Sequence, residues 1–198
     1  MSGTFPTSPA FNSLNVQSVQ PTLVSRTISG RRQSRQIGGQ YFRMTATFPP
    51  MTRAQFAPIY AFIMKQRGRF ETFSLTLPVI SIGQGSPAGT PLVNGASQTG
   101  RSIVTDGWNA SITVFKAGDY LKFANHDKVY SVTADATSDG AGASTISIEP
   151  ALLTSPANDS AITYTAVPFT VSLVNDLQEF ATSTNGLYQF ELDFEESL

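Results

Sequence analysis

Residues 42–78 read FRMTATFPPMTRAQFAPIYAFIMKQRGRFETFSLTLP, and this stretch decides the fold class. Apolar and polar residues alternate over residues 40–48, which is the period of a strand with one buried face. Pro49 and Pro50 end this strand because proline has no N–H to donate to a ladder. A second alternating run over residues 70–77 predicts another strand.

Between the two strands, residues 52–67 predict a helix. Thr52 is suited to the N-cap, and Gln55 three positions later completes a capping box. The apolar residues that follow have the spacing of a core-facing helical stripe: Phe56, Ile59, Tyr60 and Ile63. Gly68 gives the C-terminal stop. A helix between strands is expected to cover one face of the sheet that the strands form.

Outside this stretch, the composition and the length of the β-like runs change at residue 81 and change back at residue 168. Residues 81–167 hold many glycines and prolines and then short β-like runs at about ten-residue spacing, which is typical of a small barrel or sandwich. Residues 169–174 and 187–196 again alternate as longer strands. Residues 1–25 are rich in Ser, Pro, Asn and Gln and predict an extended N-terminal arm with little structure of its own.

We therefore predict a mainly β protein with an inserted domain. Residues 26–80 and 168–198 form an antiparallel β-sandwich with one flanking helix, and residues 81–167 form a small β-barrel or sandwich inserted between them. The alternative is two consecutive domains divided near residue 80, with the last two strands pairing with the middle domain.

The charged residues are distributed unevenly along the chain. Residues 1–79 carry nine basic residues and one acidic residue, a net charge of +8, whereas residues 80–198 carry four basic and thirteen acidic residues, a net charge of −9. The two parts could pack on each other within a monomer. Alternatively, the basic face of one subunit meets the acidic face of the next, in a head-to-tail contact that closes into a ring or continues into a filament. A basic arm for nucleic acid is a third reading, but SGRRQSRQIGG lacks interleaved aromatic residues for base stacking.

Composition excludes much enzyme chemistry. The chain has no cysteine and one histidine, which excludes disulfides, thiolate catalysis and any site that needs two histidines. No apolar run approaches the roughly 20 residues that span a bilayer, and the first residues lack the pattern of a secretory signal. Only carboxylate chemistry remains for a hydrolase, and no catalytic constellation supports it. We expect no enzyme activity, no cofactor and no metal site.

The order of these features resembles a known class of proteins. A strand, a double proline, a capped helix, an arginine-rich turn and a strand are followed by KAGDYLKF, KVYSVTAD and TISIEP. This order resembles the minor, distal tail and baseplate structural proteins of tailed bacteriophages. The resemblance implies a tail-tube-like β-sandwich that assembles into a ring, of six subunits, with a further β domain outside.

The resemblance also implies a function and partners. The chain is expected to be a virion protein, made in the bacterial cytoplasm, that connects the tail tube to baseplate or receptor-binding parts. Its partners are copies of itself and other tail proteins, with no nucleic-acid specificity. Combined with the charge distribution, this predicts subunit contacts between one set of arginines and one set of acids. The arginines are Arg31, Arg32, Arg35, Arg43, Arg67 and Arg69, and the acids are Glu191, Asp193, Glu195 and Glu196.

A carbohydrate-binding module is the alternative function. Trp108 follows Asp-Gly in TDGWN, and an exposed indole there would stack on a sugar, whereas a single tryptophan in a β domain is more often part of the core. Tyr120 and Tyr130 are the nearby aromatic residues that would complete such a site. The two functions are compatible, because an outer domain on a phage tail can contact glycans on the host surface.

Overall fold

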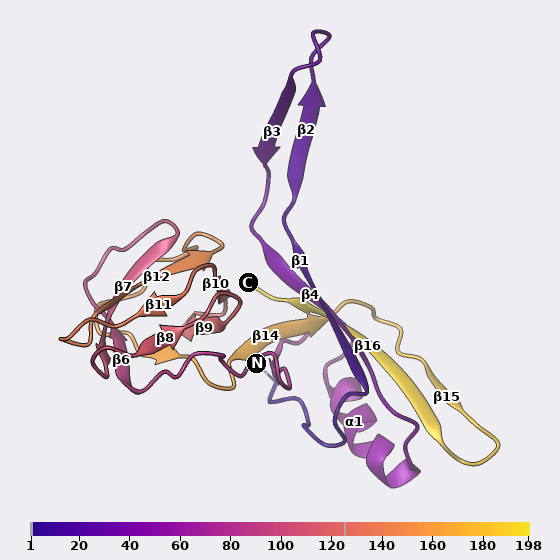
Figure 1. The fold of residues 1–198 in the computed structure, drawn as a ribbon. Helices are drawn as coiled ribbons and strands as arrows, with labels where there is room; N and C mark the ends of the chain where they lie inside the picture. Colours follow the sequence, from indigo (N-terminus) through magenta and orange to yellow (C-terminus); the bar gives the residue numbers. More distant parts are fainter. Residues whose placement is uncertain (1, 125) are drawn as a thin grey trace.

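The computed structural model describes residues 2–124 and 126–198 and shows a mainly β protein (Figure 1). This confirms the predicted fold class. In the described part, α1 (Arg53–Lys65) is the one α-helix, and it accompanies several antiparallel sheets. Its start follows the predicted capping box: the Thr52 N–H donates to Gln55 Oε1 at 3.0 Å. Gly68 follows the helix with a φ of +66°, a conformation that favours glycine.

The first sheet joins segments from both ends of the chain. Its strands, in spatial order, are β1 (Ser13–Val19), β4 (Tyr41–Thr47), β16 (Tyr188–Glu196), β14 (Pro168–Leu173) and β5 (Phe73–Thr76). β15 (Phe180–Thr182) pairs with the N-terminal part of β16. All these pairings are antiparallel. The late strands β14 and β16 therefore complete the sheet begun by β4 and β5.

One face of this sheet is apolar and packs against α1. Phe56, Ile59 and Ile63 of α1 are buried in the same core as the inward residues of β4, β5, β14 and β16. Alternation explains the burial: in β16, Phe190, Leu192 and Phe194 are buried, while the residues between them are exposed or half-buried.

The N-terminal segment differs from the expected loose arm. β1 pairs with β4 along its whole length, from Ser13 opposite Thr47 to Val19 opposite Tyr41. Before it, the Phe5 side chain is buried in the core of the first sheet. The sequence of β1 is polar because β1 is an edge strand and only one of its faces contributes side chains to the core. Its backbone hydrogen bonds to β4 hold it in place.

A second set of strands forms a nearly closed barrel. Its strand order is β13 (Ile162–Thr163), β9 (Tyr120–Phe123), β10 (Val129–Val132), β12 (Ser144–Glu149), β7 (Ser102–Trp108) and β6 (Gly89–Val93). A bridge between Leu92 and Ala161 brings the two edge strands together. The short strands β8 (Thr113–Phe115) and β11 (Ala136–Thr137) pair beside it. The barrel has an apolar core of its own.

The remaining pair of strands forms a projecting hairpin. β2 (Thr22–Arg26) and β3 (Arg32–Gln36) pair only with each other and continue outward from β1 and β4 (Figure 1). Every residue of both strands is exposed. A two-stranded hairpin without further packing is only marginally stable in water, so this segment is the part of the molecule most suited to an intermolecular contact.

Candidate functional site

The projecting hairpin carries four arginines within or beside its two strands. Arg26 ends β2 and Arg32 begins β3, and they lie directly opposite each other in the ladder. Arg31 precedes β3, and Arg35 lies opposite Leu23. No acidic residue occurs between residues 20 and 40. Like charges placed opposite each other destabilise an isolated pair of strands, so this hairpin would be stabilised by carboxylates from elsewhere.

The hairpin also exposes apolar side chains. Leu23 is 59% exposed, and Val24, Ile28 and Ile37 are exposed as well. Aliphatic groups next to arginines form a surface that suits protein partners, since interface cores are enriched in apolar residues and arginine.

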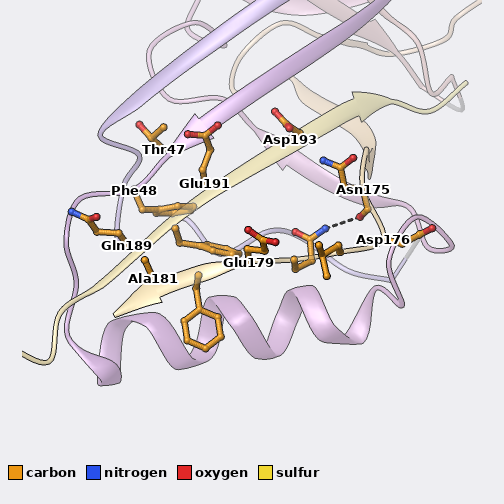
Figure 2. Close-up of a pocket in the computed structure, with 13 residues that line it drawn as sticks. Thr47, Phe48, Asn175, Asp176, Glu179, Ala181, Gln189, Glu191 and Asp193 are labelled. Carbon is orange, nitrogen blue, oxygen red and sulfur yellow. Dashed lines mark hydrogen bonds between the residues drawn. The ribbon is translucent and has the colours of Figure 1, made fainter. Parts of the chain in front are cut away.

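Three of the four predicted acids lie on the outer face of the first sheet. Glu191 is exposed, and Asp193 and Glu195 are half-buried. Glu195 lies opposite Arg43 in the β4–β16 ladder, and Asp193 Oδ1 accepts a hydrogen bond from Thr45 Oγ1 at 2.6 Å. Part of this acidic row is thus matched within the chain, while Glu191 projects into solvent beside Thr47 and Asp193 (Figure 2).

A groove of about 790 Å³ runs beside these acids. On this side of β16 the pairing with β14 ends at Leu173 opposite Phe194, and the pairing with β15 begins at Phe180 opposite Phe190. The chain between those strands bulges away from β16, and the groove opens there (Figure 2). The bulge adds two carboxylates that sequence reasoning missed, Asp176 and Glu179.

Arg67 and Arg69 lie in the turn after α1 and are exposed. The Arg69 backbone N–H donates to Asp176 Oδ1 at 3.1 Å, so this turn is fastened to the bulge beside the groove. The structure therefore places Arg69, and the turn that also holds Arg67, beside an acid of the same chain, a contact that no local sequence pattern predicts.

Glu196 differs from the other predicted interface acids. Its side chain is fully buried and forms an ion pair with Lys128 of the barrel. Glu196 Oε2 also accepts the Phe42 N–H at 3.1 Å, and Oε1 accepts the Val129 N–H at 3.0 Å. We therefore withdraw Glu196 as a subunit contact: its carboxylate is used inside the chain.

The Lys128–Glu196 pair joins the two parts of the molecule. Lys128 Nζ also donates to the Gln40 carbonyl at 2.9 Å and lies 4.9 Å from the centre of the Phe42 ring. Burial lowers the pKa of Lys128, and Glu196 opposes that shift. Buried ions are costly unless paired and hydrogen-bonded, and here a single cluster satisfies both charges across the junction.

A second set of polar contacts lies beside this ion pair. Lys122 Nζ donates to the Pro168 carbonyl at 3.2 Å and to Thr170 Oγ1 at 3.0 Å, and Thr170 Oγ1 donates to Asp127 Oδ1 at 3.1 Å. Val129 of the barrel is buried in the core of the first sheet. The barrel is thus held by polar and apolar contacts as well as by its two connections.

The three residues of the predicted glycan site are used for packing. Trp108 is 5% exposed, and its Nε1–H donates to Thr105 Oγ1 at 2.9 Å. Tyr130 is fully buried and accepts the Leu153 N–H at its hydroxyl. Tyr120 is half-buried, with its ring edge-on to Phe42. Trp108 and Tyr130 are buried and present no free ring face to a sugar, so the carbohydrate alternative loses two of its three contact residues.

Trp108 provides a direct test because it is the one tryptophan in the sequence. We expect a fluorescence spectrum typical of a buried indole, with no change when a panel of glycans is added. Unfolding in denaturant, which exposes the indole, is the positive control. Glycan-dependent quenching in the folded protein would contradict the assignment of Trp108 to the barrel core.

The described residues contain no group of three or more His, Asp or Glu side chains arranged to hold a metal ion. Within the same residues, no helix combines the length and the apolar character that crossing a membrane requires.

The barrel carries the decisive likeness to known proteins. Residues 81–167 match the family described as "Distal tail protein pb9, B domain". The barrel is thus similar to a domain of a phage distal tail protein. Such distal tail proteins are structural rather than enzymatic, in agreement with the predicted absence of enzyme activity. The matched B domain is the part of the chain that forms the barrel. A search of curated proteins found no match.

Proposed function

We propose that the chain is the subunit of a ring at the end of a phage tail tube, and that the ring connects the tube to baseplate or receptor-binding parts. The B-domain match supports the tail role. The observation that carries the ring is the projecting hairpin, an exposed pair of strands with no partner in the described part of its own chain. The ring is a homohexamer, made in the bacterial cytoplasm and built into the virion.

The ring closes through head-to-tail contacts between unlike surfaces. The basic surface includes Arg31, Arg32 and Arg35 on the hairpin, with Arg43, Arg67 and Arg69 on the first sheet and the turn after α1. The acidic surface includes Glu191, Asp193 and Glu195. A contact between two different patches repeats around an axis and forms a closed ring when the rotation closes.

Solution mass at two salt concentrations tests the ring. We expect a closed oligomer at about 0.1 M salt that dissociates at about 1 M salt, where the screening length falls from about 10 Å to about 3 Å. Negative-stain images should show rings. An oligomer that is indifferent to salt would retain the ring and reject charge pairing as its cause.

The triple variant Arg31→Glu, Arg32→Glu, Arg35→Glu tests the basic surface. All three residues are exposed, so the fold should be kept, and the oligomer should be lost because acids would then face acids. Light scattering gives the mass and circular dichroism gives the fold. Normal assembly of the folded triple variant would rule out this set of arginines as the ring contact.

A further inference from the structure

The groove beside β16 and the hairpin β2–β3 carry opposite charges that no ion pair within the described residues uses. We infer that the groove of one copy receives the hairpin of a second copy, with the hairpin face that carries Val24, Arg26 and Arg32 turned toward the groove. This inference rests on the proposed function and specifies which surfaces meet.

The groove supplies negative charge from both of its sides. Glu191 and Asp193 project from β16, and Asp176 and Glu179 come from the bulge between β14 and β15. The ion pairs found among residues 2–124 and 126–198 involve none of these four carboxylates. Asp193 and Asp176 accept hydrogen bonds from neutral donors, Thr45 Oγ1 and the Arg69 N–H. Four acids close together favour a cationic occupant.

The groove also supplies apolar surface. Phe180 and Leu177 are exposed lining residues, whereas Phe48 and Phe190 also line the groove but are almost fully buried. An occupant that matches both features must present cations next to aliphatic groups. This is the arrangement of a well-packed interface centre, where apolar groups exclude water and so strengthen the neighbouring charge contacts.

The hairpin presents this combination on one face. Side chains two residues apart point to the same side of a strand. One face therefore carries Val24 and Arg26 from β2, with Ser34 and Arg32 opposite them. The other face carries Leu23 and Ser25, opposite Arg35 and Gln33. Only the first face places two arginines directly opposite each other, so carboxylates relieve the larger repulsion there.

The hairpin belongs in the groove of another molecule. It projects away from both the barrel and the first sheet (Figure 1). Most of the residues that line the groove belong instead to β15, to the bulge before it and to β16. β2 and β3 pair with no other strand of the described chain. A contact between these two separate patches is heterologous, which is the kind of contact that builds a ring.

Two folded variants that each fail alone, but assemble together, test the inference. The hairpin variant is Arg26→Glu with Arg32→Glu, and the groove variant is Glu179→Lys with Glu191→Lys. All four residues are exposed, and the groove variant leaves the bonded Asp176 and Asp193 unchanged. In each variant alone like charges would meet, and we expect association to weaken about 100-fold.

Mixing the two variants restores opposite charges at every contact. A glutamate hairpin then meets a lysine groove, and an arginine hairpin meets an acidic groove. We expect an equimolar mixture, and a single chain with all four changes, to recover the mass of the parent oligomer in sedimentation velocity. The matched control is Arg101→Glu with Lys116→Glu on the barrel, an equal change of charge that should leave assembly intact.

The outcomes separate this inference from the proposed function. Folded variants that assemble alone, or a mixture that stays dissociated, would overturn the docking of hairpin into groove and leave the ring itself standing. A parent chain that is monomeric at every concentration tested would also overturn it. Antibody labelling of phage tails tests the tail location independently of these variants: labelling away from the tail end would overturn the proposed function.

Discussion

Replacing Lys128 with methionine is expected to lower the free energy of unfolding by about 3–5 kcal/mol. The Lys128 side chain is 3% exposed and is the ion-pair partner of the fully buried Glu196. Methionine fills a similar volume but leaves the Glu196 carboxylate buried without a counter-charge. Urea unfolding followed by circular dichroism measures the loss.

A double variant separates the charge pair from packing. Lys128→Met with Glu196→Gln removes both charges and keeps an amide oxygen that can accept the N–H of Val129. Because the two side chains are in contact, the double variant should lose clearly less than the sum of the single variants. Additive losses would show that the ion pair contributes no coupling across the junction. A Lys128→Met loss below about 1 kcal/mol would contradict the buried-charge argument.

Replacing Phe5 with alanine is the second change with a large expected effect, about 3–5 kcal/mol. The Phe5 ring is buried among Phe62, Phe73 and Phe194, with ring centres 5.6 to 6.0 Å away. Backbone bonds fix this segment as well, since the Phe5 N–H donates to the Ser74 carbonyl at 2.8 Å. The variant would leave a cavity the size of a ring in the core beside α1.

Phe70 is the matched control for Phe5. It is 75% exposed, so Phe70→Ala should change the free energy of unfolding by less than about 0.5 kcal/mol. Both variants remove the same ring from the same kind of residue, and they differ only in its environment. Equal effects in chemical denaturation would show that the N-terminal segment is not packed in solution as it is in the structure.

The regular elements could be predicted because their signal is local. Alternation gave β4, β5, β14 and β16, and the capping box gave the start of α1. The same alternation also carried a signal about Glu196. Phe190, Leu192 and Phe194 point inward, so Glu196, two residues further, falls on the buried side. The prediction that Glu196 is an interface acid considered its charge but not its position in the alternation, and it was wrong.

Other features depend on contacts between distant residues. The groove exists because the chain leaves β16 between Leu173 and Phe180, and nothing near Asp176 or Glu179 encodes that departure. Phe5 lies among polar residues and prolines, and its burial follows from β5 and β16, which are far away in sequence. Trp108 follows Asp-Gly, and the local sequence is compatible with an exposed or a core indole; closure of the barrel buries it.

The charge asymmetry along the sequence has a different meaning in three dimensions. β16 lies between β4 and β14, so four acids of the negative part share a sheet with Arg43 of the positive part. The two parts are therefore interleaved rather than separate faces. The hairpin keeps its arginines apart from acids, and so it is the basic surface best suited to contact another subunit.

The central position of β16 has a consequence for the order in which the molecule forms on the ribosome. β4 is synthesised early and β14 late, and the strand that must lie between them is made after both. The barrel, residues 81–167, is by then complete and can already have folded around its own core. Until β16 emerges, the edges of β4 and β14 are open to pairing with other nascent chains. The same late strand brings Glu196 to Lys128. The first sheet is therefore completed, and the barrel is attached to it, in the same folding step.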